Sequence, residues 1–316
     1  MEHLTIPSAA GRTHVVTEGD GPLVLFVHGF PESWYSWRFQ LPALAAAGFR
    51  AAALDVRGYG RSSRPSAVDA YRMTELVDDV AAVIDALGNG PAVVVGHDWG
   101  SPITANAGLL RPDVVRAVAL MSVPYVPRSG PRPTELFARV GGDDAFYIDH
   151  FQLPGRAEAE MEPDVRGWIS GMYASLSADT MSHDRERNAF FVPPGRTMRE
   201  RFATDRPAWL TDEVLEFFVG EFERTGLTGG LNRYRNVDRD WEDLAAYDAV
   251  PLTLPSLFVG GADDPVVHGG REAIAAFGHT LPDVRGVHVL HGVGHWVQQE
   301  APDAVNGLLL DWLRTL

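Results

Sequence analysis

One turn of this chain carries an aspartate at the position where a nucleophile would stand. The segment Gly96-His97-Asp98-Trp99-Gly100 follows the apolar run Ala92–Val95, and it has the small-x-nucleophile-x-small pattern of a strand-to-helix turn that exposes a reactive side chain. Serine is the usual central residue. A carboxylate needs no base to become a nucleophile, and its attack on an sp³ carbon gives an ester. Asp98 therefore predicts attack on a strained or halogenated carbon rather than cleavage of an ordinary ester.

Asp98 alone has a simpler interpretation as a helix N-cap, because aspartate often caps helices. Two further residues weigh against that interpretation. Asp264 stands directly before Pro265 in a predicted loop, and His295 stands in a glycine-rich segment near the C-terminus. Their chain order of nucleophile, acid and histidine is that of hydrolases with such a turn. Asp263 is the alternative acid, and we favour Asp264 because these loops usually carry the acid directly before proline.

A second turn could supply an amide for a developing oxyanion. The apolar run Leu25–Val27 ends in His28-Gly29-Phe30-Pro31, where glycine allows unusual dihedral angles and proline fixes φ. In hydrolases of this kind the oxyanion is held by the amide after the nucleophile and by one amide from this earlier loop. Those two amides would belong to Trp99 and Phe30. A structural turn without a ligand is the alternative for this segment.

The elements that must position these residues follow from the apolar pattern. Six runs are continuously apolar rather than alternating, which favours a parallel sheet covered on both faces. These runs are Leu23–Val27, Phe49–Leu54, Ala92–Val95, Val115–Met121, Ser256–Val259 and Val287–Leu290. Stripes of helical spacing run from Leu76 to Leu87, before Gly88, and from Val305 to Leu313, after Pro302. The alternation of strand and helix predicts a doubly wound α/β fold.

The pattern changes between the fourth and fifth of these runs. Strand-like runs are absent there, charges, prolines and aromatic residues increase, and Leu215, Phe218 and Phe222 keep helical spacing. We interpret this stretch as an α-helical lobe inserted between two strands of the sheet. The predicted organisation is a core of residues 1–124 and 252–316 with a helical cap of residues 125–251.

The composition narrows the classes of partner. The 316 residues carry a net charge of −15, which argues against binding to nucleic acid or to an anionic membrane. There is no cysteine, so disulfides, a thiolate metal site and a cysteine nucleophile are excluded. No signal peptide or membrane span is visible, and we expect a cytoplasmic protein. His288 and His291 would not converge on one ion, and the first strand is not followed by a dinucleotide loop, so neither metal nor cofactor is expected.

Taken together, these motifs resemble those of the α/β-hydrolase-fold epoxide hydrolases, in particular the hydrolase domain of the soluble epoxide hydrolases. The resemblance covers nearly the whole chain and includes the lobe segments 151–160 and 226–236. It implies an α/β-hydrolase fold with a mostly parallel eight-stranded sheet, flanking helices and an inserted α-helical cap domain.

The resemblance also implies two lobe tyrosines that point at the substrate oxygen. Tyr234 matches the second through its Leu-Asn-x-Tyr-Arg-Asn frame, and Tyr147 matches the first, four residues before Phe151. His150 occupies a position that is often aromatic in relatives, and there it would change the polarity of the pocket or assist Tyr147. Packing inside the lobe is the alternative role for either tyrosine.

The predicted reaction is the conversion of an epoxide and water to a vicinal diol. Asp98 would attack a ring carbon while Tyr147 and Tyr234 hydrogen-bond the ring oxygen and one of them donates a proton to it. His295, oriented by Asp264, would then activate water to hydrolyse the ester.

We expect a small hydrophobic epoxide as the substrate, in a pocket lined by Phe30, Trp99, Trp34 and His150. Trp99 does not separate this activity from that of a haloalkane dehalogenase, which uses the same aspartate nucleophile and is the first alternative. A catalytically silent scaffold that binds a ligand or partner is the second. A serine esterase is weaker, because Ser101 lies past the turn. The sequence leaves open whether the chain forms a homodimer.

Overall fold

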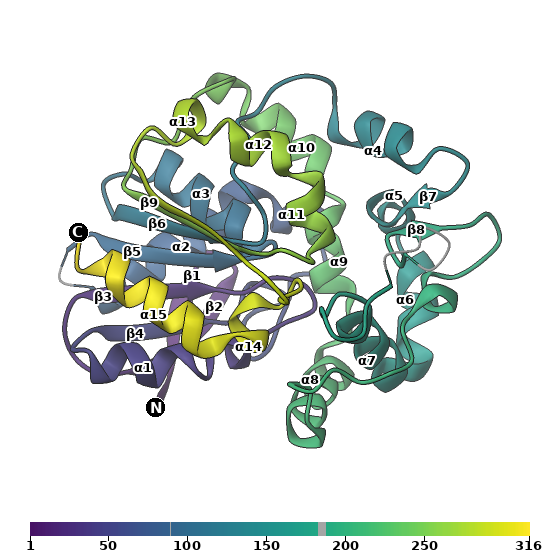
Figure 1. Ribbon diagram of the computed structural model, residues 1–316, viewed down its shortest axis with the longest axis horizontal. Coiled ribbons are helices and arrows are strands. Elements are labelled where there is room, and N and C mark those ends of the chain that lie inside the picture. Colours follow the sequence, from purple (N-terminus) through teal and green to yellow (C-terminus); the bar gives the residue numbers. More distant parts are fainter. Residues whose placement is uncertain (89, 183–187) are drawn as a thin grey trace.

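An eight-stranded sheet forms the centre of the protein in the computed structural model, which describes residues 1–316 except for residue 89 and residues 183–187 (Figure 1). The strand order is β1-β2-β4-β3-β5-β6-β9-β10. Strand β2 is antiparallel to both β1 and β4, and all other neighbours are parallel. The strands are β1 Glu2–Ser8, β2 Gly11–Glu18, β3 Leu23–Val27, β4 Arg50–Leu54, β5 Ala92–His97, β6 Val115–Met121, β9 Ser256–Gly261 and β10 Val284–Leu290.

Helices cover both faces of this sheet, which explains why its central strands are continuously apolar. Val24 and Phe26 of β3 belong to a buried cluster with residues of α1 (Gln40–Ala46) and α15 (Pro302–Leu313), and α15 crosses one face of the sheet in Figure 1. Leu25 and Val27 belong to a second cluster, with residues of α2 (Met73–Leu87) and α3 (Gly100–Leu110). Successive residues of one strand thus pack against helices on opposite faces of the sheet.

The segment between β6 and β9 is mainly helical, and most of it lies to one side of the sheet, on the right in Figure 1. Its helices are α4 Pro133–Gly141, α5 Tyr147–Gln152, α6 Arg156–Met161, α7 Val165–Ser175, α8 Asp212–Thr225, α9 Thr228–Tyr234 and α10 Val237–Asp243. A small antiparallel pair, β7 (Ala145–Phe146) with β8 (Phe191–Val192), was not predicted, because two-residue strands leave no apolar run. We call this segment the lobe.

Short helices complete the core after β9. They are α11 Pro265–Gly269, α12 Arg271–Ala275, α13 Phe277–Thr280 and α14 Val297–Glu300. Within the described residues, none of the helices combines the length and the apolar character needed to cross a membrane.

The sheet agrees with the sequence prediction except at its N-terminal end. All six predicted runs form strands, although β4 begins at Arg50 rather than Phe49. Gly88 is the C-cap of α2, and Pro302 opens α15, as predicted. The sequence prediction did not locate β1 and β2. These strands mix polar and apolar residues, and β1 is an edge strand with exposed side chains, so neither forms a continuous apolar run.

Candidate active site

The turn after β5 holds Asp98 in a backbone conformation that few residues adopt. The φ angle of Asp98 is +49°, in the left-handed region, where a side chain other than glycine is strained. A Cβ atom on Gly96 would lie 2.0 Å from the carbonyl oxygen of Gly100, and one on Gly100 would lie 1.9 Å from that of Val27. Both glycines are therefore required by close backbone approach, and the turn between β5 and α3 presents the Asp98 carboxylate at the edge of the sheet.

His295 lies between two carboxylates. Its Nε2 atom is 3.5 Å from Oδ2 of Asp98, and its Nδ1 atom is 3.1 Å from Oδ2 of Asp264. Asp264 is fully buried at the start of α11, where its other carboxylate oxygen accepts the amide N–H of Val266 at 2.8 Å. Of the two candidate acids, Asp264 contacts the histidine, whereas Asp263 lies on the loop before it. Three strand ends thus bring Asp98, Asp264 and His295 together.

The electrostatics of this arrangement favour a protonated histidine. Burial would lower the pKa of His295, but the charges and hydrogen bonds of Asp264 and Asp98 raise it well above its ordinary value. Burial would likewise raise the pKa of Asp264, and His295 holds it below its ordinary value. In the free protein this direction of the His295 pKa favours an imidazolium, which faces two carboxylates. Neutralising either carboxylate would lower the pKa of His295.

An amide from the earlier turn already contacts the nucleophile. The backbone N–H of Phe30 donates to Oδ1 of Asp98 at 2.7 Å. The amide of Trp99 lies on the turn that carries Asp98, directly before the first residue of α3. A negative charge that develops on an Asp98 oxygen would therefore form beside a fixed backbone donor.

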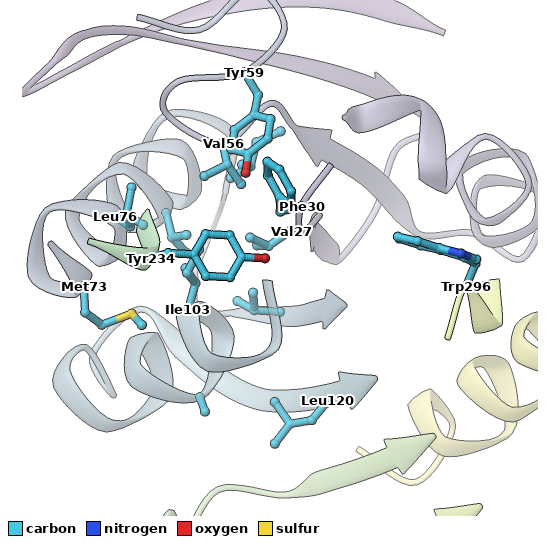
Figure 2. Close-up of a cluster of buried hydrophobic side chains, with 14 of the residues drawn as sticks. Val27, Phe30, Val56, Tyr59, Met73, Leu76, Ile103, Leu120, Tyr234 and Trp296 are labelled. Carbon is cyan, nitrogen blue, oxygen red and sulfur yellow. The ribbon is translucent and has the colours of Figure 1, made fainter. Parts of the chain in front are cut away.

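The two lobe tyrosines come together from different helices. Tyr147 opens α5 and Tyr234 closes α9, and their ring centroids are 5.8 Å apart with the rings edge to face. Tyr147 stacks on Phe190 at 4.8 Å, and the edges of Phe30 and Trp99 meet Tyr234 at 5.4 and 5.1 Å. Figure 2 shows Tyr234 beside Phe30, with its hydroxyl directed away from the α2 side of the cluster.

Both phenols retain their protons. Burial is the main cause that raises the pKa of Tyr147 and of Tyr234 far above the ordinary value, and the negative charge of Asp98 raises both further. Two neutral hydroxyl donors therefore lie near an anionic carboxylate.

A cavity of about 510 Å³ connects the two sides of the site. Asp98 and Trp99 line it from the core and Tyr147 lines it from the lobe. Most of the other lining is apolar, including Val123, Phe137, Phe146, Phe190, Phe191 and Val266. Its size and lining suit a small hydrophobic ligand. Among the residues that the structure describes, no group of three or more His, Asp or Glu side chains gathers as a metal site would require.

Comparison with known proteins places this geometry in a family. Residues 22–302 match the model of the alpha/beta hydrolase fold family. Epoxide hydrolase A of Mycobacterium tuberculosis is 43% identical, with 96% of this chain and 95% of the relative covered. Epoxide hydrolase B of the same species is 39% identical, with 98% of each covered.

Solved structures agree with these sequence comparisons. An epoxide hydrolase from an endophytic Streptomyces has a TM-score of 0.96 and 59% identity, with 99% of this chain and 95% of that chain covered. Epoxide hydrolase A from Mycobacterium thermoresistibile has a TM-score of 0.92 and 42% identity, with 99% and 98% covered. The chain belongs to the α/β-hydrolase-fold epoxide hydrolases.

Three of the four predicted pocket residues of this epoxide hydrolase do not line this cavity. Phe30 is buried, and its ring packs beside Tyr234. Trp34 opens a 3₁₀ helix, where its ring meets His3 at 5.4 Å and Phe217 at 5.8 Å, and it is not among the cavity-lining residues. His150 also lies outside this cavity, with its Nε2 atom 3.2 Å from a carboxylate oxygen of Glu160. Of the four residues expected to line the pocket, only Trp99 lines this cavity, and the expectation for Phe30, Trp34 and His150 is corrected. A residue type suggests pocket lining, but the direction of a side chain depends on its position in the helix.

Sequence reasoning also missed a buried network behind the nucleophile. Glu32, next to the predicted oxyanion turn, accepts the amide N–H of Gly29 at 2.9 Å and lies 2.8 Å from Nδ1 of His97. Burial would raise the pKa of Glu32, but His97 brings it down to about 2. The other nitrogen of His97 lies 2.7 Å from the carbonyl oxygen of His295. Hydrogen bonds thereby connect the oxyanion turn, the end of β5 and the His295 loop. A charged residue, Glu32, within an aromatic-rich segment was the sequence feature that could have indicated this network.

Proposed function

We propose that this epoxide hydrolase converts a small hydrophobic epoxide and water to a vicinal diol through a covalent ester on Asp98. One observation carries the proposal: a carboxylate nucleophile shares its cavity with Tyr147, and the ring of Tyr147 lies 5.8 Å from that of Tyr234, a second protonated phenol. Epoxide opening needs both a nucleophile and a proton donor, because an unassisted alkoxide is a poor leaving group.

Ring opening is the first step. One oxygen of Asp98 attacks a ring carbon, the bond between that carbon and the ring oxygen breaks, and a proton from Tyr147 or Tyr234 moves to the oxygen. The charge of Asp98 is consumed in this step, so its contribution to the raised pKa of both phenols disappears. Proton donation therefore becomes easier as the new bond forms. The products are a neutral hydroxy-ester and a tyrosinate, which the imidazolium of His295 reprotonates.

Formation of the ester also prepares His295 to act as a base. Of the two carboxylates that raise its pKa, only Asp264 stays charged in the ester. The neutral imidazole takes a proton from water as the water oxygen attacks the carbonyl carbon of Asp98. The Phe30 and Trp99 amides hold the resulting oxyanion. Its collapse expels the alkoxide, which takes the remaining proton from the new carboxyl group, and the diol leaves with Asp98 and His295 in their starting charge states.

The lobe supplies the acid and most of the apolar lining in this proposal. We propose that residues 125–251 act as a cap domain over a core of residues 1–124 and 252–316. Tyr147 and Tyr234 both stand on cap helices, and the cap contributes Phe137, Phe146 and Phe190 to the cavity. This lining supports an aromatic or aliphatic epoxide rather than a charged one.

Isotope labelling tests the proposal directly. A single turnover of styrene oxide in ¹⁸O-labelled water should place the label in the Asp98 carboxylate and leave the diol unlabelled. Label in the diol after that turnover would mean direct attack by water and would overturn the covalent step. A haloalkane of similar size is the control: halide release without diol formation from styrene oxide would select the dehalogenase alternative.

A further inference from the structure

Glu300, a residue that the reaction above does not use, holds the loop that carries His295. It ends α14, and its carboxylate is mostly enclosed. One oxygen accepts the amide N–H of Gly294 at 2.9 Å, and the other accepts the amide N–H of Trp296 at 3.0 Å. These two amides flank His295, so one carboxylate fixes the backbone on both sides of the histidine.

The same carboxylate reaches the lobe. The oxygen that binds the Gly294 amide also accepts the amide N–H of Ala178 at 3.0 Å, just beyond the end of α7. Next to it, the amide of His295 donates to the carbonyl oxygen of Leu176 at 2.8 Å. A Cβ atom on Gly294 would lie 2.6 Å from the Ala178 nitrogen, which shows how closely the two segments approach.

The end of α7 contacts the oxyanion turn as well. The Tyr173 hydroxyl donates to the carbonyl oxygen of Pro31 at 2.6 Å, while the Tyr173 carbonyl accepts the indole N–H of Trp296 at 3.0 Å. The rings of Tyr173 and Trp296 meet edge to face at 4.6 Å. The end of α7 is thus packed between the loop of the base and the loop of the oxyanion donor.

We propose that Glu300 is a positioning residue for His295, which fastens the histidine loop to the end of α7 so that the base is aligned with Asp98 only while the lobe is docked. The three amide donors suit a carboxylate, because each of its oxygens can accept and neither must donate. Burial raises the pKa of Glu300 above its ordinary value, and the three amides oppose that rise. The proposal rests on the function given above, because it concerns the step that uses His295.

A positioning role for Glu300 predicts different effects on ester formation and on ester hydrolysis, whereas a general loss of structure would slow both steps. Ester formation uses Asp98 and the two tyrosines, and these tyrosines stand on α5 and α9 rather than on the segments that Glu300 binds. Ester hydrolysis uses His295. In Glu300→Gln the new NH₂ group faces an amide N–H, so the histidine loop should shift. Hydrolysis should then slow by about 10- to 100-fold, since misplacing a catalytic group by about 1 Å has an effect of that size.

The experiment is a rapid-quench single turnover with styrene oxide, in which intact-mass analysis follows the ester as it forms and decays. For Glu300→Gln we expect unchanged ester formation and slow decay. Asp164→Ala is the matched control, because Asp164 caps the other end of α7 by accepting the Gly167 amide at 2.8 Å and lies away from His295. This control loosens the same helix and should leave both rates as in the parent protein.

Other outcomes overturn the proposal. If Glu300→Gln slows both steps equally and lowers Tm, or if Asp164→Ala shows the same slow ester decay, Glu300 has only a structural role. If the ester decays at the parent rate in Glu300→Gln, Glu300 has no role in positioning His295. Ala178→Pro removes the lobe amide that donates to Glu300, and it tests the proposal if Glu300→Gln does not fold. Ester decay at the parent rate in Ala178→Pro would refute the link between the histidine loop and the lobe. Absence of any ester in the parent protein would instead contradict the proposed function.

Discussion

The two sides of the active site are held in place by different kinds of interaction. On the core side, Asp98, Asp264 and His295 stand on loops at strand ends and are held by charge and by backbone hydrogen bonds. On the lobe side, Tyr147 and Tyr234 are neutral and are held by aromatic packing against Phe residues and Trp99.

This difference assigns different tasks to the two sides. On the core side, attack by Asp98 and proton abstraction by His295 each depend on one group. Loss of that group stops its step, because no neighbouring residue can act as the nucleophile or the base. The lobe hydroxyls come as a pair, so one can partly replace the other. Substrate fit also belongs mainly to the lobe, whose side chains form much of the cavity lining. Changes on the core side should therefore abolish individual steps, and changes on the lobe side should give graded losses.

The largest loss should follow removal of the nucleophile. Asp98→Ala should lower turnover by roughly 10⁶-fold, comparable to the loss of a catalytic nucleophile in other hydrolases. Diol formation measured by chromatography checks this result. Asp263→Ala is the control on the acid loop and should keep its activity. Residual turnover near that of the parent protein in Asp98→Ala would refute the role of the carboxylate.

The next largest loss should follow neutralisation of the buried acid. Asp264→Asn should lower ester hydrolysis by about 10⁴-fold, because it changes the protonation and orientation of His295. Ester formation should be less affected, so burst kinetics should reveal accumulated ester. Asp263→Asn should behave like the parent protein. If Asp263→Asn rather than Asp264→Asn slows hydrolysis, the acid has been assigned to the wrong residue.

The lobe tyrosines should give a smaller and graded loss. The double variant Tyr147→Phe/Tyr234→Phe should slow ring opening by about 10²- to 10⁴-fold, and each single variant should slow it less, since general acid catalysis contributes about that much. Stopped-flow rates of ester formation test this expectation. Tyr125→Phe is the control, because the Tyr125 hydroxyl donates to the Val250 carbonyl outside this cavity. Full activity in the double variant would contradict the acid role.

The smallest expected change is a shift in a pKa. Asp98→Asn should lower the pKa of His295, because it removes one of the two carboxylates that favour the imidazolium. NMR titration of the imidazole ring measures the shift. By the same reasoning, ester hydrolysis in the parent protein should slow as the pH falls, because the base must be neutral. An unchanged pKa in Asp98→Asn would mean that Asp98 does not act on His295.

Much of the core could be predicted from the sequence because it depends on local signals. Continuous apolar runs located six strands, and the glycines around Asp98 indicated the turn that places it. The meeting of Asp98, Asp264 and His295 then follows from topology, since parallel strands end at one edge of the sheet.

The lobe and the hydrogen-bond networks were harder to predict for a physical reason. The direction of Trp34 and His150 depends on how short helices are rotated, which no local pattern encodes. The contacts of Glu32 and Glu300 join segments far apart in the chain. The tyrosines were found through resemblance to a family and not through spacing, because a buried aromatic residue alone indicates packing.

In the proposed reaction a covalent ester forms on Asp98, and His295 is needed to release it. Its most direct test is to treat His295→Ala with styrene oxide and to measure the intact mass of the protein. We expect a persistent increase in mass equal to one substrate molecule, which peptide mapping places on Asp98. Undiminished turnover without any adduct would contradict it.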